Sequence, residues 1–345
     1  MTIARKMLVG MHISRYYHCI SRCVRKAMLC GQGNEHRKQW IEDRIEVLAD
    51  IFAIGVCGFA VMDNHLHVLT RLEPAQGRSW SAEEVIRRWI RLHPPKDLDQ
   101  DDPVAVRRYI REFKKDSEEV EKLRQRLMDL SWFMKSLKEP ISRMANKEDG
   151  VRGTFWESRY KSIAILDQEA LLATCMYIDL NPVAAGVARL PETSPHTSVR
   201  QRVAHIRRQR GGIDKLKAAR RSAAMGCRAL GDLEEGHWLC PFQDRRLRGG
   251  ERAGMFEGLS LGSYLLLLDA TSRMVRTGKA RVSPAAREIL DRLGTDLETW
   301  GDRLRHLLGR ERLYGNFFST DRDKLRSLAE SRGCHHVANL AGLPA

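Results

Sequence analysis

The chain has 345 residues, and 43% of them are hydrophobic, which is enough apolar material for a folded core. It carries 59 Lys and Arg against 44 Asp and Glu, so its formal net charge is +15. This composition excludes an acidic or disordered protein. The excess of positive charge favours phosphate-rich partners, because cationic side chains that neutralise a nucleic-acid backbone release its condensed counterions.

The sequence predicts no segment that spans a bilayer. The run from Leu265 to Leu268 ends at Asp269, and a span needs about 20 apolar residues. The run from Met7 to Met11 is too short for the core of a secretory signal. We therefore expect a cytoplasmic protein without membrane contact. The length predicts roughly two domains, and the composition changes after about Leu190.

The first 75 residues alternate between β-rich and amphipathic patterns. Asp63-Asn64 lies between two apolar, β-rich runs and tolerates the positive φ of a tight hairpin turn. The order predicted is strand, helix, strand, strand, over residues 16–24, 35–52, 54–62 and 66–72. This order of elements is typical of the first half of an α+β fold.

A charged, helical stretch follows from Ser81 to Asn146, with a break at residues 97–103. After it, the pattern predicts a short strand over Tyr160 to Ile165. Asp167 is then a candidate N-cap for a helix from Gln168 to about Asn181, which we expect Pro182 to terminate.

The most basic segment is residues 189–228, which holds eleven Lys and Arg against two acidic residues. Arginine-rich helices are often only solvated surface, but we expect phosphate contacts here. The residues singled out are Arg207, Arg208, Arg210, Arg220 and Arg221. Amphipathic helices are predicted further on, over residues 259–275, 284–293, 297–308 and 320–331.

Two histidines, His65 and His67, bracket Leu66 at the start of a predicted strand. The two-residue period of a strand sends both imidazoles to one face, where they can bind one cation. For an isolated His-x-His motif, one buried and one exposed ring is the more common arrangement. The motif alone is therefore weak.

Tyr177 and Asn181 lie four residues apart on the predicted helix, so they share one face. Each residue alone fits a structural role, as a core aromatic and a C-terminal helix residue. Together with the histidines they supply a nucleophile and three neutral ligands for Mg²⁺ or Mn²⁺, which a phosphoryl-transfer site needs. A phenol has a pKa near 10, and a nearby cation can offset most of the cost of ionising it at pH 7.

Two segments resemble the signature blocks of the REP-associated tyrosine transposases, a branch of the single-tyrosine HUH transposases. They are residues 63–69, with the sequence DNHLHVL, and residues 177–186, with the sequence YIDLNPVAAG. Two lesser blocks are also similar, namely Tyr17-His18 with Ser21-Arg22, and residues 153–160, GTFWESRY. The four blocks stand in the family's order and cover a little over half of the chain.

The resemblance implies an α+β fold with a ferredoxin-like antiparallel sheet, helices on one face, and the histidine pair on a central strand facing the tyrosine helix. It makes residues 1–190 the catalytic domain, with a helical insertion at about 83–147, and residues 191–345 a basic, mostly helical region of unknown role. Monomers and homodimers are both expected, and so is association with the nucleoid.

The resemblance also implies an activity. In such enzymes the tyrosine attacks a phosphodiester in single-stranded DNA at hairpin-forming repeats, forming a 5′-phosphotyrosine and freeing a 3′-hydroxyl. Carried over, Tyr177 is the nucleophile, His65 and His67 are ligands of Mg²⁺ or Mn²⁺, and Asn181 is the third ligand. Candidate DNA contacts besides the basic segment are Arg22, Trp156, Arg159 and Tyr160, and Trp80 is a further candidate for base stacking.

The sequence departs from the family at two points. Ala184 stands where the family often has Arg, and the spacing between the histidine pair and Tyr177 is long because of the charged insertion. Two other functions remain open. One is a hairpin-binding regulator of DNA or RNA that does not cleave, and the other is a hydrolase with zinc at the histidine pair, although no His-Glu-x-x-His motif accompanies it.

Overall fold

The computed structural model describes residues 8–209, 211–212, 214, 233–243, 254–277, 290, 296, 298–302, 317–319 and 321–331. Five strands in these residues form one sheet in the order β2-β3-β1-β4-β5. Strand β1 pairs antiparallel with both β3 and β4, and β2 pairs antiparallel with β3. The strands are β1 (Tyr16–Arg22), β2 (Ile54–Val61), β3 (His65–Leu72), β4 (Lys161–Ile165) and β5 (Phe317–Phe318).

The sheet is mixed rather than purely antiparallel, because the short edge strand β5 runs parallel to β4. This strand comes from the C-terminal region, and no sequence pattern predicted it. The helix α14 (Arg322–Ser331) follows it, and Lys324 Nζ of this helix donates to the Leu166 carbonyl at 3.0 Å. The C-terminal region therefore extends the sheet built by the first part of the chain.

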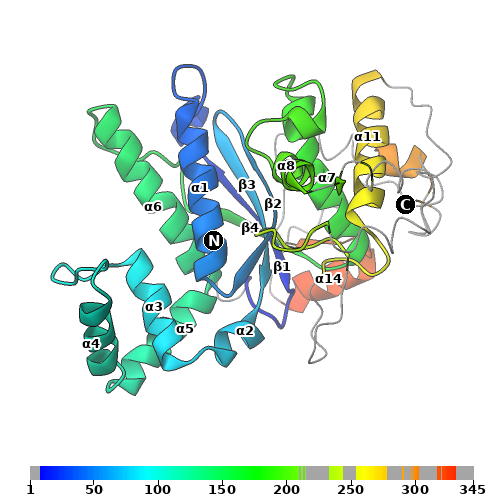
Figure 1. The fold of residues 1–345 in the computed structure, drawn as a ribbon. Coiled ribbons are helices and arrows are strands. Elements are labelled where there is room, and N and C mark those ends of the chain that lie inside the picture. The colour runs from blue at the N-terminus through cyan, green and yellow to red at the C-terminus, as the bar shows by residue number, and fades with distance from the viewer. Residues whose placement is uncertain are drawn as a thin grey trace.

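Helices cover both faces of the sheet, so the expectation of helices on one face is wrong (Figure 1). One face carries α1 (His36–Ile51) and α6 (Leu130–Glu148), and the other carries α7 (Gln168–Ala184), α8 (Ser198–Arg208) and α11 (Leu261–Thr277). The physical reason lies in the strands themselves. Val68 and Leu69 point to opposite faces of β3, and both are fully buried.

The charged insertion is a set of helices between β3 and β4, as the sequence predicts. Asp102, Asp116 and Asp129 each accept a hydrogen bond from a backbone N–H in the first turn of the helix that follows. Besides α6, the helices are α2 (Pro74–Ser79), α3 (Ala82–Leu92), α4 (Pro103–Phe113) and α5 (Ser117–Met128). Their apolar faces join the same core as the sheet.

Asp167 caps α7 as predicted, because its Oδ1 accepts from Ala170 N at 2.7 Å. The predicted end of this helix at Pro182 is wrong, since α7 continues to Ala184. Pro182 lies in the last turn, so its missing N–H removes only one bond of the helix. The next N–H groups keep their partners, and Ala185 N donates to Asn181 O at 2.9 Å.

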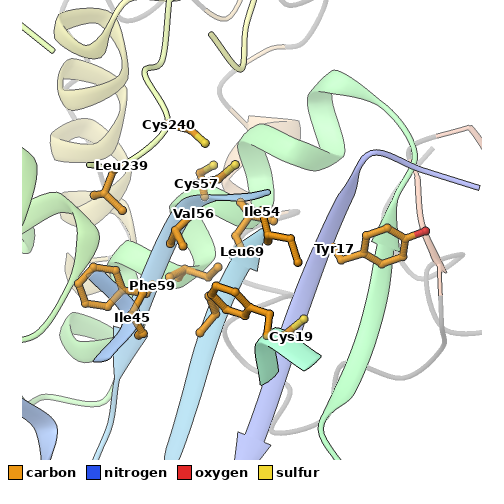
Figure 2. Close-up of a cluster of buried hydrophobic side chains, with 14 of the residues drawn as sticks. Tyr17, Cys19, Ile45, Ile54, Val56, Cys57, Phe59, Leu69, Leu239 and Cys240 are labelled. Carbon is orange, nitrogen blue, oxygen red and sulfur yellow. The ribbon is translucent and has the colours of Figure 1, made fainter. Parts of the chain in front are cut away.

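Segments after residue 190 pack directly on β2. Ser198 Oγ accepts from Phe59 N at 3.0 Å, and Cys240 N donates to Val56 O at 2.8 Å. Figure 2 shows Cys240 beside Cys57 of β2, and the two thiols are hydrogen-bonded. None of the helices in the described ranges is both long and apolar enough to cross a membrane. The helices predicted at 284–293 and 297–308 lie largely outside the described residues.

Gly55 allows this close approach to β2. A Cβ atom at this position would lie 2.5 Å from Cys240 Sγ, well inside van der Waals contact. A side chain at Gly55 would therefore push the segment around Cys240 away from the sheet.

Asp179 joins the three helices α7, α8 and α11. Its carboxylate accepts from Ser198 Oγ at 2.6 Å, from Val199 N at 3.1 Å and from Tyr264 OH at 2.5 Å. Burial raises the pKa of this carboxyl group, and the hydrogen bonds oppose that effect. Helix α7 is therefore held against the sheet by α8 and α11.

Replacing Asp179 with alanine should destabilise the fold. The change leaves the buried Tyr264 hydroxyl and the Val199 N–H without their acceptor, which we expect to cost roughly 2–4 kcal/mol in the free energy of unfolding. Urea unfolding followed by circular dichroism measures this. The matched control is Asp269→Ala, which removes an exposed ion pair with Arg273 and should cost less than about 0.5 kcal/mol.

Candidate active site

The register between β1 and β3 brings polar side chains to the sheet face that α7 covers. Arg22 lies opposite His65, and Ile20 lies opposite His67. Because side chains alternate along a strand, His18 shares this face with Ile20 and Arg22. The two histidines of the His-x-His motif are therefore accompanied by a third, from the neighbouring strand.

Helix α7 places Tyr177 against this face. The centroid of its ring lies 5.3 Å from that of His67 and 5.9 Å from that of His18, both in edge contact. Asn181, one turn further along α7, has its amide Nδ2 3.5 Å from His67 Nε2. The Asn181 side chain also hydrogen-bonds the Tyr177 phenol and His65. The structure thus brings together the four residues that the sequence singled out.

Hydrogen bonds orient both imidazoles of the motif. His65 Nδ1 lies 2.7 Å from Asn64 Oδ1, an acceptor, so Nδ1 carries the proton of the neutral ring and Nε2 keeps its lone pair. His67 Nδ1 lies 2.9 Å from His18 Nε2. If His67 is the donor in this pair, its Nε2 also keeps a lone pair, directed toward Asn181.

Burial keeps these histidines neutral. Burial, with a smaller effect from the positive charge of Arg22, lowers the pKa of His65 to about 4. Burial likewise lowers the pKa of His18 to about 3 and that of His67 well below its usual value. Only the neutral imidazole can bind a metal, so all three rings are in the ligating form at neutral pH.

Burial has the opposite consequence for Tyr177, whose side chain is 8% exposed. It raises the pKa of the phenol to about 12, against the hydrogen bond from Asn181 and the charge of Arg22, which both lower it. Ionising this phenol at pH 7 costs roughly 7 kcal/mol without further help. A cation between the histidines and the phenol would remove much of that cost.

The donor set fits a divalent cation. Both imidazoles are neutral, and each has its Nδ1 engaged by a second side chain, the arrangement that orients ligating histidines in metal sites. Among the described residues, no three His, Cys, Asp or Glu side chains form a metal-binding group. A third protein ligand would therefore come from the Asn181 amide, which touches both histidines.

Sequence reasoning placed His18 in a lesser block without assigning it to the site, and it did not single out Lys161. Lys161 on β4 lies opposite Ile20 of β1, so it shares the same face, and burial lowers its pKa to about 8. His18 stands four residues before Arg22 in the first strand, and that spacing places both on one face. The sequence could reveal this cluster only if the neighbours of the first strand in the sheet were already known.

The candidate stacking aromatics are buried in the protein, which contradicts their predicted role. Trp156 is 8% exposed, and its Nε1 donates to the Lys138 carbonyl at 3.0 Å. Tyr160 and Trp80 are buried as well, and the Arg88 guanidinium covers the Trp80 ring at 4.1 Å. A base can stack only on an exposed ring face, so these three rings belong to the core.

The predicted basic contacts are distributed over different parts of the molecule. Arg22 is half-buried beside His65, and Arg159 is exposed. Arg207 and Arg208 are exposed at the end of α8, where the charge of Arg208 reaches Glu46 of α1. Arg210, Arg220 and Arg221 lie outside the described residues.

Comparisons with known proteins add a distant likeness. No family model matches the chain, and no curated protein matches it. Among solved structures, the chain is similar to one described as the "Structure of the REP associates tyrosine transposase bound to a REP hairpin". The two share 14% sequence identity and a TM-score of 0.35, over 59% of this chain and 86% of the other. At this level of similarity no property of the site follows from the likeness.

The buried histidines should make the fold sensitive to acid. An unfolded histidine has a pKa of 6.5, whereas that of folded His18 is about 3, so the unfolded chain binds more protons across this window. Stability should therefore fall as the pH drops below 6.5, by up to about 1.4 kcal/mol per pH unit for each such histidine.

Urea unfolding between pH 4 and pH 7, in the presence of a chelator, measures this slope. His18→Gln should reduce the slope by the contribution of one histidine. His12→Gln, at an exposed position, is the matched control. An unchanged slope in the His18 variant would show that this ring is not buried as a neutral group.

Proposed function

We propose that the protein is a metal-dependent endonuclease and strand transferase that acts on single-stranded DNA at hairpin-forming repeats, with Tyr177 as the nucleophile. The observation that supports this most is the contact of the Tyr177 ring with His67 at 5.3 Å, together with the Asn181 amide that touches both. The resemblance of residues 63–69 and 177–186 to the signature blocks of the tyrosine transposases supports the same activity.

The proposed step is a transesterification. Tyr177 Oη forms a bond to the scissile phosphorus while the bond from phosphorus to the 3′-oxygen breaks, and the electron pair of that bond goes to the 3′-oxygen. The phenol loses one proton and the 3′-oxygen gains one, so the products are a 5′-phosphotyrosine and a free 3′-hydroxyl. Because the energy of the ester bond is retained, a 3′-hydroxyl can attack in reverse and rejoin a strand.

We infer that His65 Nε2, His67 Nε2 and the amide oxygen of Asn181 would hold the cation, either Mn²⁺ or Mg²⁺. Mg²⁺ prefers oxygen ligands, so two imidazoles make Mn²⁺ the better match. When bound, the cation supplies charge stabilisation for the phosphate and lowers the pKa of the phenol. Asn64 and His18 orient the imidazoles, and Arg22 adds positive charge beside the phosphate position.

A hairpin-binding protein that does not cleave is the second candidate. The burial of Tyr177 and its raised pKa favour this function, since a nucleophile must reach its phosphate. The close set of His65, His67, Tyr177 and Asn181 favours the enzyme instead, because binding alone has no need of these four residues together.

The enzyme should form a covalent adduct that survives denaturation. We expect the purified protein with Mn²⁺ and a hairpin oligonucleotide carrying single-stranded flanks, taken from repeats beside its gene, to give an SDS-stable complex on a gel. Tyr177→Phe should abolish the adduct while leaving DNA affinity within about threefold, because it removes the nucleophilic oxygen and keeps the ring. Tyr109→Phe on α4 is the matched control and should keep the adduct.

Adduct formation should require the cation. Chelation should reduce the adduct by at least about 100-fold, and His67→Ala should do the same even with Mn²⁺ present, because a ligand is lost. The binding of Mn²⁺ is measured separately by calorimetry on the protein without DNA. Tight hairpin binding that is indifferent to chelation, with no adduct on any tested repeat, would favour the non-cleaving protein.

A further inference from the structure

We propose that three exposed arginines, Arg25, Arg152 and Arg159, form a phosphate-binding track for unpaired DNA that leads into the candidate active site. We call these residues the arginine rim. The inference deepens the proposed function and rests on it for the place of the cut. The ligand chemistry is that of a phosphodiester backbone in a single strand, which the planar guanidinium group binds through two parallel hydrogen bonds.

The three arginines lie on two segments that meet at one junction, where the end of β1 pairs with the segment before β4. Cys23 and Trp156 form an isolated antiparallel bridge there. Val24 N donates to Phe155 O at 2.9 Å, and Glu157 N donates to Arg22 O at 2.8 Å. Arg25 follows one side of this bridge closely, and Arg152 and Arg159 flank the other.

The junction is attached to the candidate active site through Asn64. The Oδ1 atom of Asn64 lies 2.7 Å from His65 Nδ1, and its Nδ2 donates to the Lys26 carbonyl at 3.2 Å. The Asn64 carbonyl also accepts from Cys23 N at 2.8 Å. One side chain therefore connects the candidate metal ligand to the turn that carries Arg25.

The charges of the rim are available for a ligand. In the described part of the chain, none of the three guanidinium groups forms an ion pair or hydrogen bond, and all three residues are exposed. Some other surface arginines are paired, since Arg87, Arg143 and Arg273 each contact a carboxylate one turn away. Between residues 150 and 160 the sequence has one acidic residue, Glu157, so the rim keeps a positive excess.

The backbone of Arg25 supports a role in binding. Arg25 has φ 54° and ψ 20°, and Lys26 has φ 56°, which is the left-handed region that glycine adopts most easily. Two successive basic residues therefore occupy positions where glycine would fold with less strain. Strained backbone of this kind is found at ligand clamps, where the side chain is needed for function. The strain and the unpaired charge are independent observations on the same residue.

The test measures binding in the Tyr177→Phe protein, so that a wrong assignment of the nucleophile does not affect it. Labelled hairpins with and without an unpaired DNA tail are titrated at several salt concentrations, with fluorescence anisotropy as the readout. Changing Arg25, Arg152 and Arg159 to Gln should weaken binding of the tailed hairpin about tenfold at low salt. It should also reduce the slope of log affinity against log salt by about 2, since each single-strand phosphate contact contributes about 0.7.

The matched control changes Arg78, Arg107 and Arg108 to Gln. These residues are also exposed and lie on α2 and α4, away from the junction. An equal loss in the control, or an equal loss for the hairpin without a tail, would overturn the track.

A single-stranded phosphodiester backbone can belong to DNA or to RNA, and hairpins with DNA or RNA tails of the same sequence distinguish the two. Tighter binding of the DNA tail supports the proposal, and tighter binding of the RNA tail overturns the assignment to DNA.

A single variant separates binding from folding. Arg25→Gly should raise the melting temperature or leave it unchanged, because glycine relieves the left-handed backbone, and it should still weaken binding of the tailed DNA. A merely structural arginine would show the reverse, with a lower melting temperature and unchanged binding. That result would remove Arg25 from the rim.

Discussion

The carboxylate of Asp179 is the interaction on which the arrangement of the site depends. It lies two residues from Tyr177 on α7, and Ser198 and Tyr264 donate hydrogen bonds to it. These bonds restrict the rotation of α7 about its own axis, because turning the helix would break them. The rotation that they select points Tyr177 and Asn181 at His67. Helices α8 and α11 therefore help to fix the orientation of the helix that carries the candidate nucleophile.

Burial has two opposite effects on the chemistry of the site. It lowers the pKa of the histidines, which keeps them neutral and able to bind a cation, and it raises the pKa of Tyr177, which makes the phenol a poorer nucleophile. Both effects have one cause, since a low-dielectric environment disfavours any charged form. A divalent cation resolves the conflict, because it needs neutral imidazoles as ligands and stabilises a phenolate beside it.

The positive charge of the chain is divided between paired and unpaired groups. Many arginines of the helical insertion pair with glutamates on the same helix, so they contribute little to the field outside the protein. The three residues of the arginine rim have no such partners among the described residues. A net charge of +15 is therefore a poor guide to where phosphate binds, and the pairing of individual side chains is a better one.

Local patterns determined much of the secondary structure and the candidate residues. The alternation of β1 to β3, the Asp167 cap, and the spacing of His65 with His67 and of Tyr177 with Asn181 are all visible in the sequence, because each depends on neighbours along the chain. Only the tertiary structure decided which strands pair, and so brought His18 and Lys161 to the same face as the histidine pair. It also placed Trp156 and Tyr160 in the core and added β5 to the sheet. Strand order and burial depend on contacts between residues far apart in sequence, and no local pattern records them.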